Sequence, residues 1–135
     1  MTTFHYLLMA GHSIYQKKLM ESLKNTGLTT GQPKVLDYLK DFDGATQKEI
    51  AAACYLEAAT VTSILNGMEA KDLIIRKRLN GNRRSFHVFM TEKGKMHQKQ
   101  VEEIFLRLEE ETFRELSVEK RDEFLDIFSQ IMTIE

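Results

Sequence analysis

Hydrophobic side chains recur at the spacing of an α-helix over much of this 135-residue chain. The spacing predicts a long amphipathic helix over about 3–25 and a second helix that ends near residue 42. Gly27 is expected to stop the first helix, and Thr29 or Thr30 is expected to cap the second. Each helix presents one hydrophobic face, which is typical of elements that pack against a protein core.

Two shorter helices are expected next. Thr46 and Glu49 have the spacing of a capping box, so a short helix is predicted from there to Cys54. A further helix is predicted over about 58–70, with hydrophobic residues on one side and small polar residues on the other. Asp72, a residue type that tolerates the left-handed backbone conformation, is expected to end it.

The hydrophobic pattern then changes from helical to alternating. Hydrophobic and basic residues alternate on both sides of Asn80-Gly81, which predicts a β-hairpin. Two more amphipathic helices, capped by Thr91 and Ser117, are expected to complete the chain. The predicted fold is therefore mainly α with a small β-hairpin wing: a winged helix-turn-helix module flanked by N- and C-terminal helices. We expect one domain over 1–135, with the module over about 30–91 and dimerisation helices over about 1–28 and 92–135.

The charge distribution adds a function to this architecture. The formal net charge is −1, but residues 71–99 hold nine Lys or Arg residues against two acidic ones, a local charge of +7. Residues 100–135 carry −7. A basic block of this kind beside a groove-sized helix is typical of a surface that binds nucleic acid.

Candidate DNA contacts follow from the chemistry of the side chains. Small hydroxyl and amide groups on the 58–70 helix can reach base edges in a major groove, and basic side chains on the hairpin can contact phosphates or enter a minor groove. Polar groups at the start of the preceding helix can contact the DNA backbone. The candidates are Gln47, Lys48, Thr60, Thr62, Ser63, Asn66, Arg76, Lys77, Arg78, Asn82, Arg83 and Arg84.

At these residues the sequence resembles the MarR family of winged-helix transcription regulators, over nearly the whole chain. The resemblance rests on Leu28-Thr29 with Gln32, Val35 and Leu36, on Thr46-Gln47-Lys48-Glu49-Ile50-Ala51, on Thr60-Val61-Thr62 with Leu65, Met68, Glu69 and Leu73-Ile74, and on Asn82-Arg83-Arg84-Ser85 running to Met90-Thr91-Glu92-Lys93-Gly94. The last stretch usually reads Asp-x-Arg, then an apolar strand, then Leu-Thr-x-x-Gly. Asn82 and Met90 depart from that pattern, and Asp72 stands where Gly is common.

The resemblance implies a homodimer that binds two half-sites of a pseudo-palindromic DNA operator and represses transcription until a small ligand releases it. The hydrophobic residues of the terminal helices independently favour a dimer, because one small module cannot cover them all. The resemblance places a ligand pocket between the dimer helices and the winged-helix module. Candidate lining residues, equally consistent with core packing, are Phe4, His12, Tyr15, Leu36 and Tyr38.

Other functions are weighed against this interpretation. A winged-helix module that binds an acidic protein instead of DNA would have the same basic hairpin. A redox or metal-responsive regulator is a further alternative, but Cys54 near a helix end is more simply a small buried residue, and no metal or cofactor is expected. No catalytic motif appears, so we expect no enzyme. With no signal peptide or membrane span in the pattern, the expected location is the cytoplasm.

Overall fold

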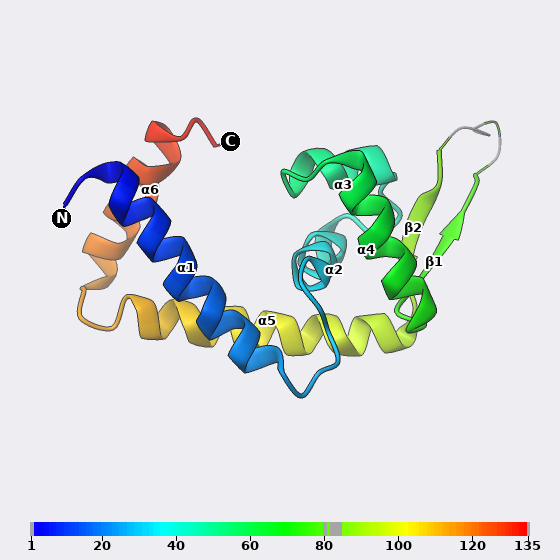
Figure 1. Cartoon of the computed structure of the whole chain (residues 1–135), viewed down its shortest axis with the longest axis horizontal. Helices are drawn as coiled ribbons and strands as arrows, with labels where there is room; N and C mark the ends of the chain where they lie inside the picture. The colour runs from blue at the N-terminus through cyan, green and yellow to red at the C-terminus, as the bar shows by residue number, and fades with distance from the viewer. Residues whose placement is uncertain (1, 80, 82–84, 135) are drawn as a thin grey trace. The chain divides into compact units, whose positions relative to one another are not determined.

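The computed structural model describes residues 2–79, 81 and 85–134, and it confirms the predicted fold class. Six helices and a two-stranded antiparallel hairpin make up this described part (Figure 1). Their bounds are α1 Phe4–Leu23, α2 Gln32–Asp41, α3 Gln47–Ala53, α4 Ala58–Ala70, β1 Ile74–Lys77, β2 His87–Met90, α5 Glu92–Thr112 and α6 Val118–Ile131. The chain forms two compact units, 1–104 and 105–135, with the boundary inside α5.

The core of the first unit lies between α2, α3, α4 and the hairpin. Each of these helices turns its hydrophobic stripe inward, and β1 and β2 add one face of the hairpin. The residues that bury nearly all their surface here include Val35, Leu36, Leu39, Ile50, Val61, Leu65, Met68, Leu73, Ile74 and Val88. This shared core fixes α4 against the hairpin, and those two elements carry most of the predicted DNA contacts.

The start of α2 differs from the prediction. The N-cap residue is Gly31, at φ 91°, and not Thr29 or Thr30. A side chain at position 31 would be strained at this φ, and its Cβ would lie 2.4 Å from Cδ1 of Ile64 on α4. The left-handed backbone of this helix start, which no local pattern indicates, therefore favours glycine, and a Cβ there would also displace the end of the Ile64 side chain.

The capping box predicted for α3 is confirmed. The backbone N–H of Glu49 donates to the Thr46 hydroxyl at 3.1 Å, and the Thr46 backbone N–H donates to the Glu49 carboxylate at 3.2 Å. These bonds from the Thr46 backbone and hydroxyl hold the pKa of Glu49 below its usual value. The ionised carboxylate therefore stabilises the fold at neutral pH, and this contribution is lost as the pH falls through the lowered pKa.

Replacing this cap has a predictable cost. Thr46→Ala is expected to lower the free energy of unfolding by about 1 kcal/mol, because it leaves the Glu49 N–H in the first turn of α3 without its partner. Denaturant unfolding at pH 7 measures the loss. Thr2→Ala, at an exposed position that precedes α1, is the control and should leave the stability unchanged. Equal stability of the two variants would contradict the role given to Thr46.

The hairpin is joined to the helical core by backbone hydrogen bonds. The strands pair in the register Ile74↔Met90, Ile75↔Phe89, Arg76↔Val88 and Lys77↔His87. The segment before α3 lies along the other edge of β2, where the Gly44 N–H donates to the Val88 carbonyl at 2.8 Å and the Val88 N–H donates to the Ala45 carbonyl at 2.9 Å. The wing is therefore connected to the start of α3 as well as to α4.

The second unit holds the end of α5 together with α6. Ser117 caps α6, as predicted, by accepting a hydrogen bond from the Lys120 N–H at 3.2 Å. The rings of Phe113, Phe124 and Phe128 follow one another at centroid distances of 5.8 and 6.0 Å. The contact of Phe113 with Phe124 packs the middle of α6 against the chain that follows α5.

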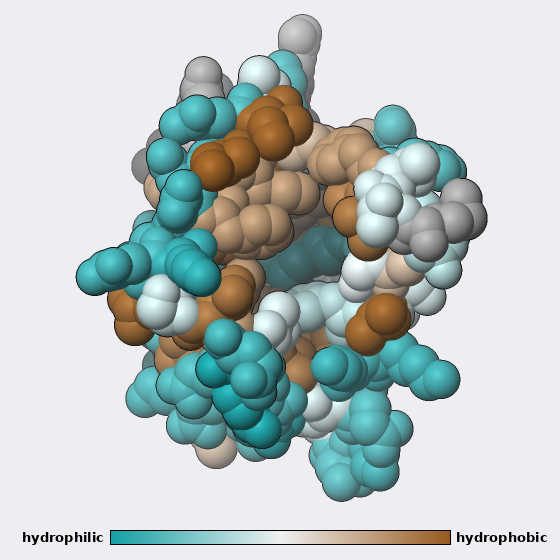
Figure 2. Space-filling view, turned by 90° about the vertical axis from the view of Figure 1, so that its left-hand side faces the viewer, coloured by the Kyte–Doolittle hydropathy of each residue, from teal (hydrophilic) through white to brown (hydrophobic). Residues whose placement is uncertain are grey.

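Hydrophobic side chains are exposed on each unit in the single chain. On α1 of the first unit they are Phe4, Leu7, Leu8, Met9 and Ile14. On the second unit they include Val118, Phe124, Leu125, Ile127 and Ile131. Figure 2 shows such side chains at the surface of the face that it displays. Exposed hydrophobic residues in this number are unusual for a monomer and are typical of surfaces that another protein copy covers.

Candidate nucleic-acid interface

Helix α4 exposes the polar face that the sequence predicts. Thr60, Thr62, Ser63 and Asn66 are all exposed, and the opposite side of the helix is buried in the core. The hydroxyl of Thr62 donates to the Ala58 carbonyl at 3.1 Å, one turn back along the helix. Because this bond uses the hydroxyl proton, Thr62 offers DNA an acceptor oxygen and a methyl group.

A single guanidinium connects α4, α3 and the hairpin. On β1, Arg76 donates from Nε and Nη2 to the two carboxylate oxygens of Glu69 on α4, each at 3.2 Å. Its Nη2 also donates to Asn66 Oδ1 at 2.7 Å, and its Nη1 donates to Gln47 Oε1 at 3.4 Å. Only 16% of the Arg76 side chain is exposed. The hydrogen bond with Arg76 lowers the pKa of Glu69, so this carboxylate stays ionised at neutral pH.

This arrangement changes the interpretation of Arg76. No acidic residue lies among the basic residues of the hairpin sequence, yet the fold supplies Glu69 from the preceding helix. Sequence reasoning did not identify Glu69 as part of the interface. The available signal was weak: an acid near the end of α4 and an arginine seven residues later, at the start of the wing.

The remaining candidates fall into two groups. Lys77 lies 5.6 Å from the centre of the Phe89 ring, and the Arg78 guanidinium lies 4.7 Å from the centre of the Phe86 ring. These cations are exposed, as is Lys48 near the start of α3. Their aromatic contacts orient the two hairpin side chains without neutralising their charge. The predicted wing contacts Asn82, Arg83 and Arg84 lie outside the described residues.

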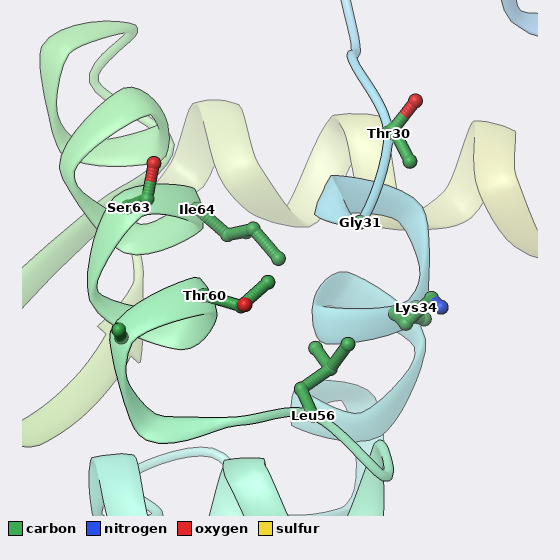
Figure 3. A pocket seen from close by; sticks show the side chains of 8 residues that line it. Thr30, Gly31, Lys34, Leu56, Thr60, Ser63 and Ile64 are labelled. Carbon is green, nitrogen blue, oxygen red and sulfur yellow. The ribbon is translucent and has the colours of Figure 1, made fainter.

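Beside α4 the surface is hollowed by an open cleft of about 480 Å³. It lies between α4 and the start of α2, and Figure 3 shows Ile64 and Leu56 pointing into it, with the Lys34 amine and the Ser63 hydroxyl pointing away. Its walls include Thr60 and Ser63, so a molecule held there would cover part of the polar face of α4. Local sequence patterns did not predict this cleft, because the two helices that form it are far apart in the chain.

The predicted ligand-pocket residues lie elsewhere. Phe4 and His12 are exposed on α1, and Tyr15 is half-buried on the same helix. Leu36 is fully buried in the core, and the half-buried Tyr38 stacks on Phe42 with ring centroids 4.9 Å apart. None of these five residues lines the cleft of Figure 3. The ligand pocket stays a prediction.

The chemistry of Cys54 does not favour a redox switch. Its sulfur is half-buried and lies 3.8 Å from the Lys34 carbonyl oxygen, to which it donates. Burial raises the pKa of this thiol, whereas a sensing cysteine needs a lowered one. Within the described ranges, no three His, Cys, Asp or Glu side chains come together as a group that could hold a metal ion.

Comparison with known proteins agrees with this geometry. A family model described as MarR family matches residues 26–85. The regulator SarZ of Staphylococcus epidermidis is 26% identical over 106 residues, which cover 78% of this chain and 69% of SarZ. No helix in the described part of the chain combines the length and hydropathy that a membrane span needs.

Solved structures give the same result. The DNA complex of Staphylococcus aureus MepR is 25% identical, with a TM-score of 0.89 and 98% of both chains covered. MepR in its DNA-binding conformation is 28% identical, with a TM-score of 0.83 and 97% of both chains covered. The repressor CouR bound to a DNA duplex is 24% identical, with a TM-score of 0.88, covering 96% of this chain and 92% of CouR.

The matched relatives are regulators and not enzymes, which confirms that expectation. The matched segment 26–85 contains α2, α3, α4 and β1, the elements that build the polar helix face and the base of the wing. In sequence, fold and site, this chain is therefore similar to the winged-helix regulators of the MarR family.

Proposed function

We propose that this protein is a sequence-specific DNA-binding transcriptional regulator that acts as a homodimer on a pseudo-palindromic operator. The observation that carries the proposal is the exposed polar face of α4 beside a basic hairpin, both held by one core. A helix of this size fits the major groove, and a dimer would place two such helices about 34 Å apart, one turn of DNA. The DNA complexes of MepR and CouR support this use of the same fold.

Each part of the interface has a distinct proposed role. Thr60, Thr62, Ser63 and Asn66 face base edges, and Lys48, Lys77 and Arg78 contact phosphates together with Arg83 and Arg84 of the wing. We assign residues 30–91 to the DNA-binding module and the helices of 1–28 and 92–135 to dimerisation. The outcome proposed for binding is repression that a small ligand relieves at the predicted pocket. A regulator of operators works in the compartment that holds DNA, so the proposed location is the cytoplasm.

Two variants separate phosphate contacts from base contacts. Lys48→Ala is expected to weaken binding to every duplex by a similar factor and to lower the slope of log affinity against log salt by about 1, because one phosphate contact is lost. Thr62→Ala is expected to change which bases are preferred at one position of each half-site and to leave the salt slope unchanged. Competitive binding to a library of duplexes, repeated at several salt concentrations, measures both effects.

The same experiment tests the function itself. Retention of the wild-type protein on duplex DNA should fall steeply as the salt concentration rises. If the protein binds no duplex at low salt, the proposal is wrong and the basic hairpin serves an acidic protein partner. If both variants lose affinity equally on every sequence, the assignment of Thr62 to base recognition is wrong.

A further inference from the structure

Two amide side chains of the proposed interface accept hydrogen bonds from one guanidinium. Asn66 on α4 and Gln47 on α3 both direct their side-chain oxygen at Arg76, at 2.7 and 3.4 Å. A guanidinium has donors only, so it accepts no bond from an amide nitrogen. The contact therefore sets which end of each amide faces the protein, and for Asn66 the shorter distance makes the bond a strong one.

The guanidinium that orients Asn66 is itself held in place. The two carboxylate oxygens of Glu69 accept hydrogen bonds from Nε and Nη2 of Arg76. This bidentate geometry fixes the plane of the arginine side chain. Asn66 and Glu69 are three residues apart on one helix, so a single side chain from β1 bridges both. The ion pair with Glu69 holds the Arg76 guanidinium in place. The Asn66 amide can therefore exchange the positions of its oxygen and nitrogen only by breaking its hydrogen bond with Arg76.

The consequence concerns what Asn66 can offer to DNA. With one lone pair of Oδ1 bonded to Arg76, the main group left for DNA is the NH₂, which donates two hydrogen bonds. The second lone pair of Oδ1 is disfavoured as an acceptor, because a donor that approaches it also approaches the positive guanidinium. Pairing of asparagine with adenine requires both a donor and an acceptor on the amide, for adenine N7 and N6. Guanine instead presents two acceptors, N7 and O6, at its major-groove edge.

We propose that Asn66 reads the operator as a donor only and selects guanine over adenine, and that Arg76 is the positioning residue that imposes this choice. The inference rests on the proposed DNA-binding function and adds a base preference to it. Gln47, whose oxygen is engaged by the same guanidinium, presents donors in the same way, which suits a phosphate oxygen. The pair of Asn66 and Arg76 thus acts as a specificity determinant.

The first test compares three proteins on one operator, obtained by selecting duplexes that bind the wild-type chain at fixed salt. Substituting 7-deazaguanine for each guanine in turn removes one N7 acceptor at a time. At one guanine per half-site, the wild type is expected to lose about 5- to 100-fold in affinity. Asn66→Ala should lose nothing further at that guanine. Asn66→Asp keeps an oxygen for Arg76 but replaces the NH₂ by a second acceptor, so its preference should move to cytosine, which donates from N4.

The second test addresses the positioning role. Arg76→Lys keeps the positive charge but removes the planar fork, so the Asn66 amide is free to turn and adenine should become accepted at the same position. Arg114→Lys, at an exposed position outside the proposed interface, is the matched control and should leave the base preference unchanged. Circular dichroism and thermal unfolding establish that the variants are folded. The Asn66 variants lie at an exposed position, so the first test stands even if Arg76→Lys does not fold.

The outcomes separate the inference from the function on which it depends. A wild-type preference for adenine that disappears in Asn66→Ala overturns the inference while leaving DNA binding established. The same holds if 7-deazaguanine weakens wild type and Asn66→Ala equally at every position, or if Arg76→Lys keeps the wild-type base preference. If the wild-type protein selects no duplex at all, the proposed function is wrong, and the inference falls with it.

Discussion

Gly94→Ala is expected to lower the free energy of unfolding by about 2–4 kcal/mol, which is a large part of the stability of a small protein. Gly94 is buried in the first turns of α5, directly against the start of the hairpin. A Cβ at this position would lie 2.0 Å from the backbone oxygen of Leu73 and 3.0 Å from its carbonyl carbon. The first distance is far shorter than real Cβ contacts and the second is tight, and both are with backbone atoms, so the backbone of one segment would have to move.

The Leu73 carbonyl has little freedom to move. It accepts a hydrogen bond from the Thr91 N–H at 3.0 Å, and β1 begins at the next residue. The Thr91 hydroxyl donates to the Asp72 carbonyl at 2.6 Å and accepts a bond from the Gly94 N–H at 2.9 Å. Displacing this carbonyl would disturb the cap of α5 and the base of the wing together. We therefore expect Gly94→Ala to weaken DNA binding as well as stability.

Gly11→Ala provides the matched control. Gly11 also lies within a helix, but a Cβ there would meet nothing within 4 Å. This substitution is expected to raise the stability by about 0.5–1 kcal/mol, since alanine loses less backbone entropy in a helix than glycine. Denaturant unfolding of both variants, at one fixed protein concentration, measures the difference. A Gly94→Ala protein as stable as Gly11→Ala would show that the contact with Leu73 does not constrain the fold.

The features predicted correctly from the sequence are those set by neighbouring residues. Thr46 and Glu49 cap α3 across three residues, Ser117 caps α6 in the same way, and Asp72 takes the left-handed conformation at φ 61°. Gly31 was missed because glycine is needed there for a left-handed backbone at φ 91° beside the Ile64 side chain of another helix, and the sequence around it does not indicate either feature. Capping preferences describe what a helix start favours, whereas packing between distant segments decides which residue a crowded position can hold.

The same distinction between local sequence and long-range packing applies to the proposed DNA-binding site. The exposed polar face of α4 could be predicted, since it follows from one helical repeat and the residue types on it. The partners of Arg76 could not, because Glu69, Asn66 and Gln47 reach it from two different helices. A basic residue in a wing sequence indicates positive potential near DNA, but only the folded chain shows whether that charge is free or already paired. For Arg83 and Arg84 the phosphate contact stays a prediction.

Leu7→Asp is expected to convert the homodimer into a monomer and to weaken binding to a full operator by about 100-fold or more. Leu7 lies on α1 among the hydrophobic residues that the single chain leaves exposed, with 54% of its own surface accessible. In a dimer these faces would be buried against a second copy, and a buried carboxylate without a partner is costly. A monomer contacts only one half-site and loses the gain in affinity that comes from linking two binding modules.

The exposure of Leu7 also predicts that Leu7→Asp leaves the fold of the single chain unchanged. Because Leu7 is not part of the core of its own chain, the helix content and the fold of the monomer should persist, as circular dichroism would show. Tyr55→Asp, at a position 80% exposed between α3 and α4 and outside the segments assigned to dimerisation, is the control and should stay dimeric. Analytical ultracentrifugation gives the oligomeric state, and binding to half and full operators gives the loss in affinity. Should Leu7→Asp sediment as a dimer with unchanged operator affinity, the exposed face of α1 is not the dimer interface, and another surface must pair the two DNA-binding modules.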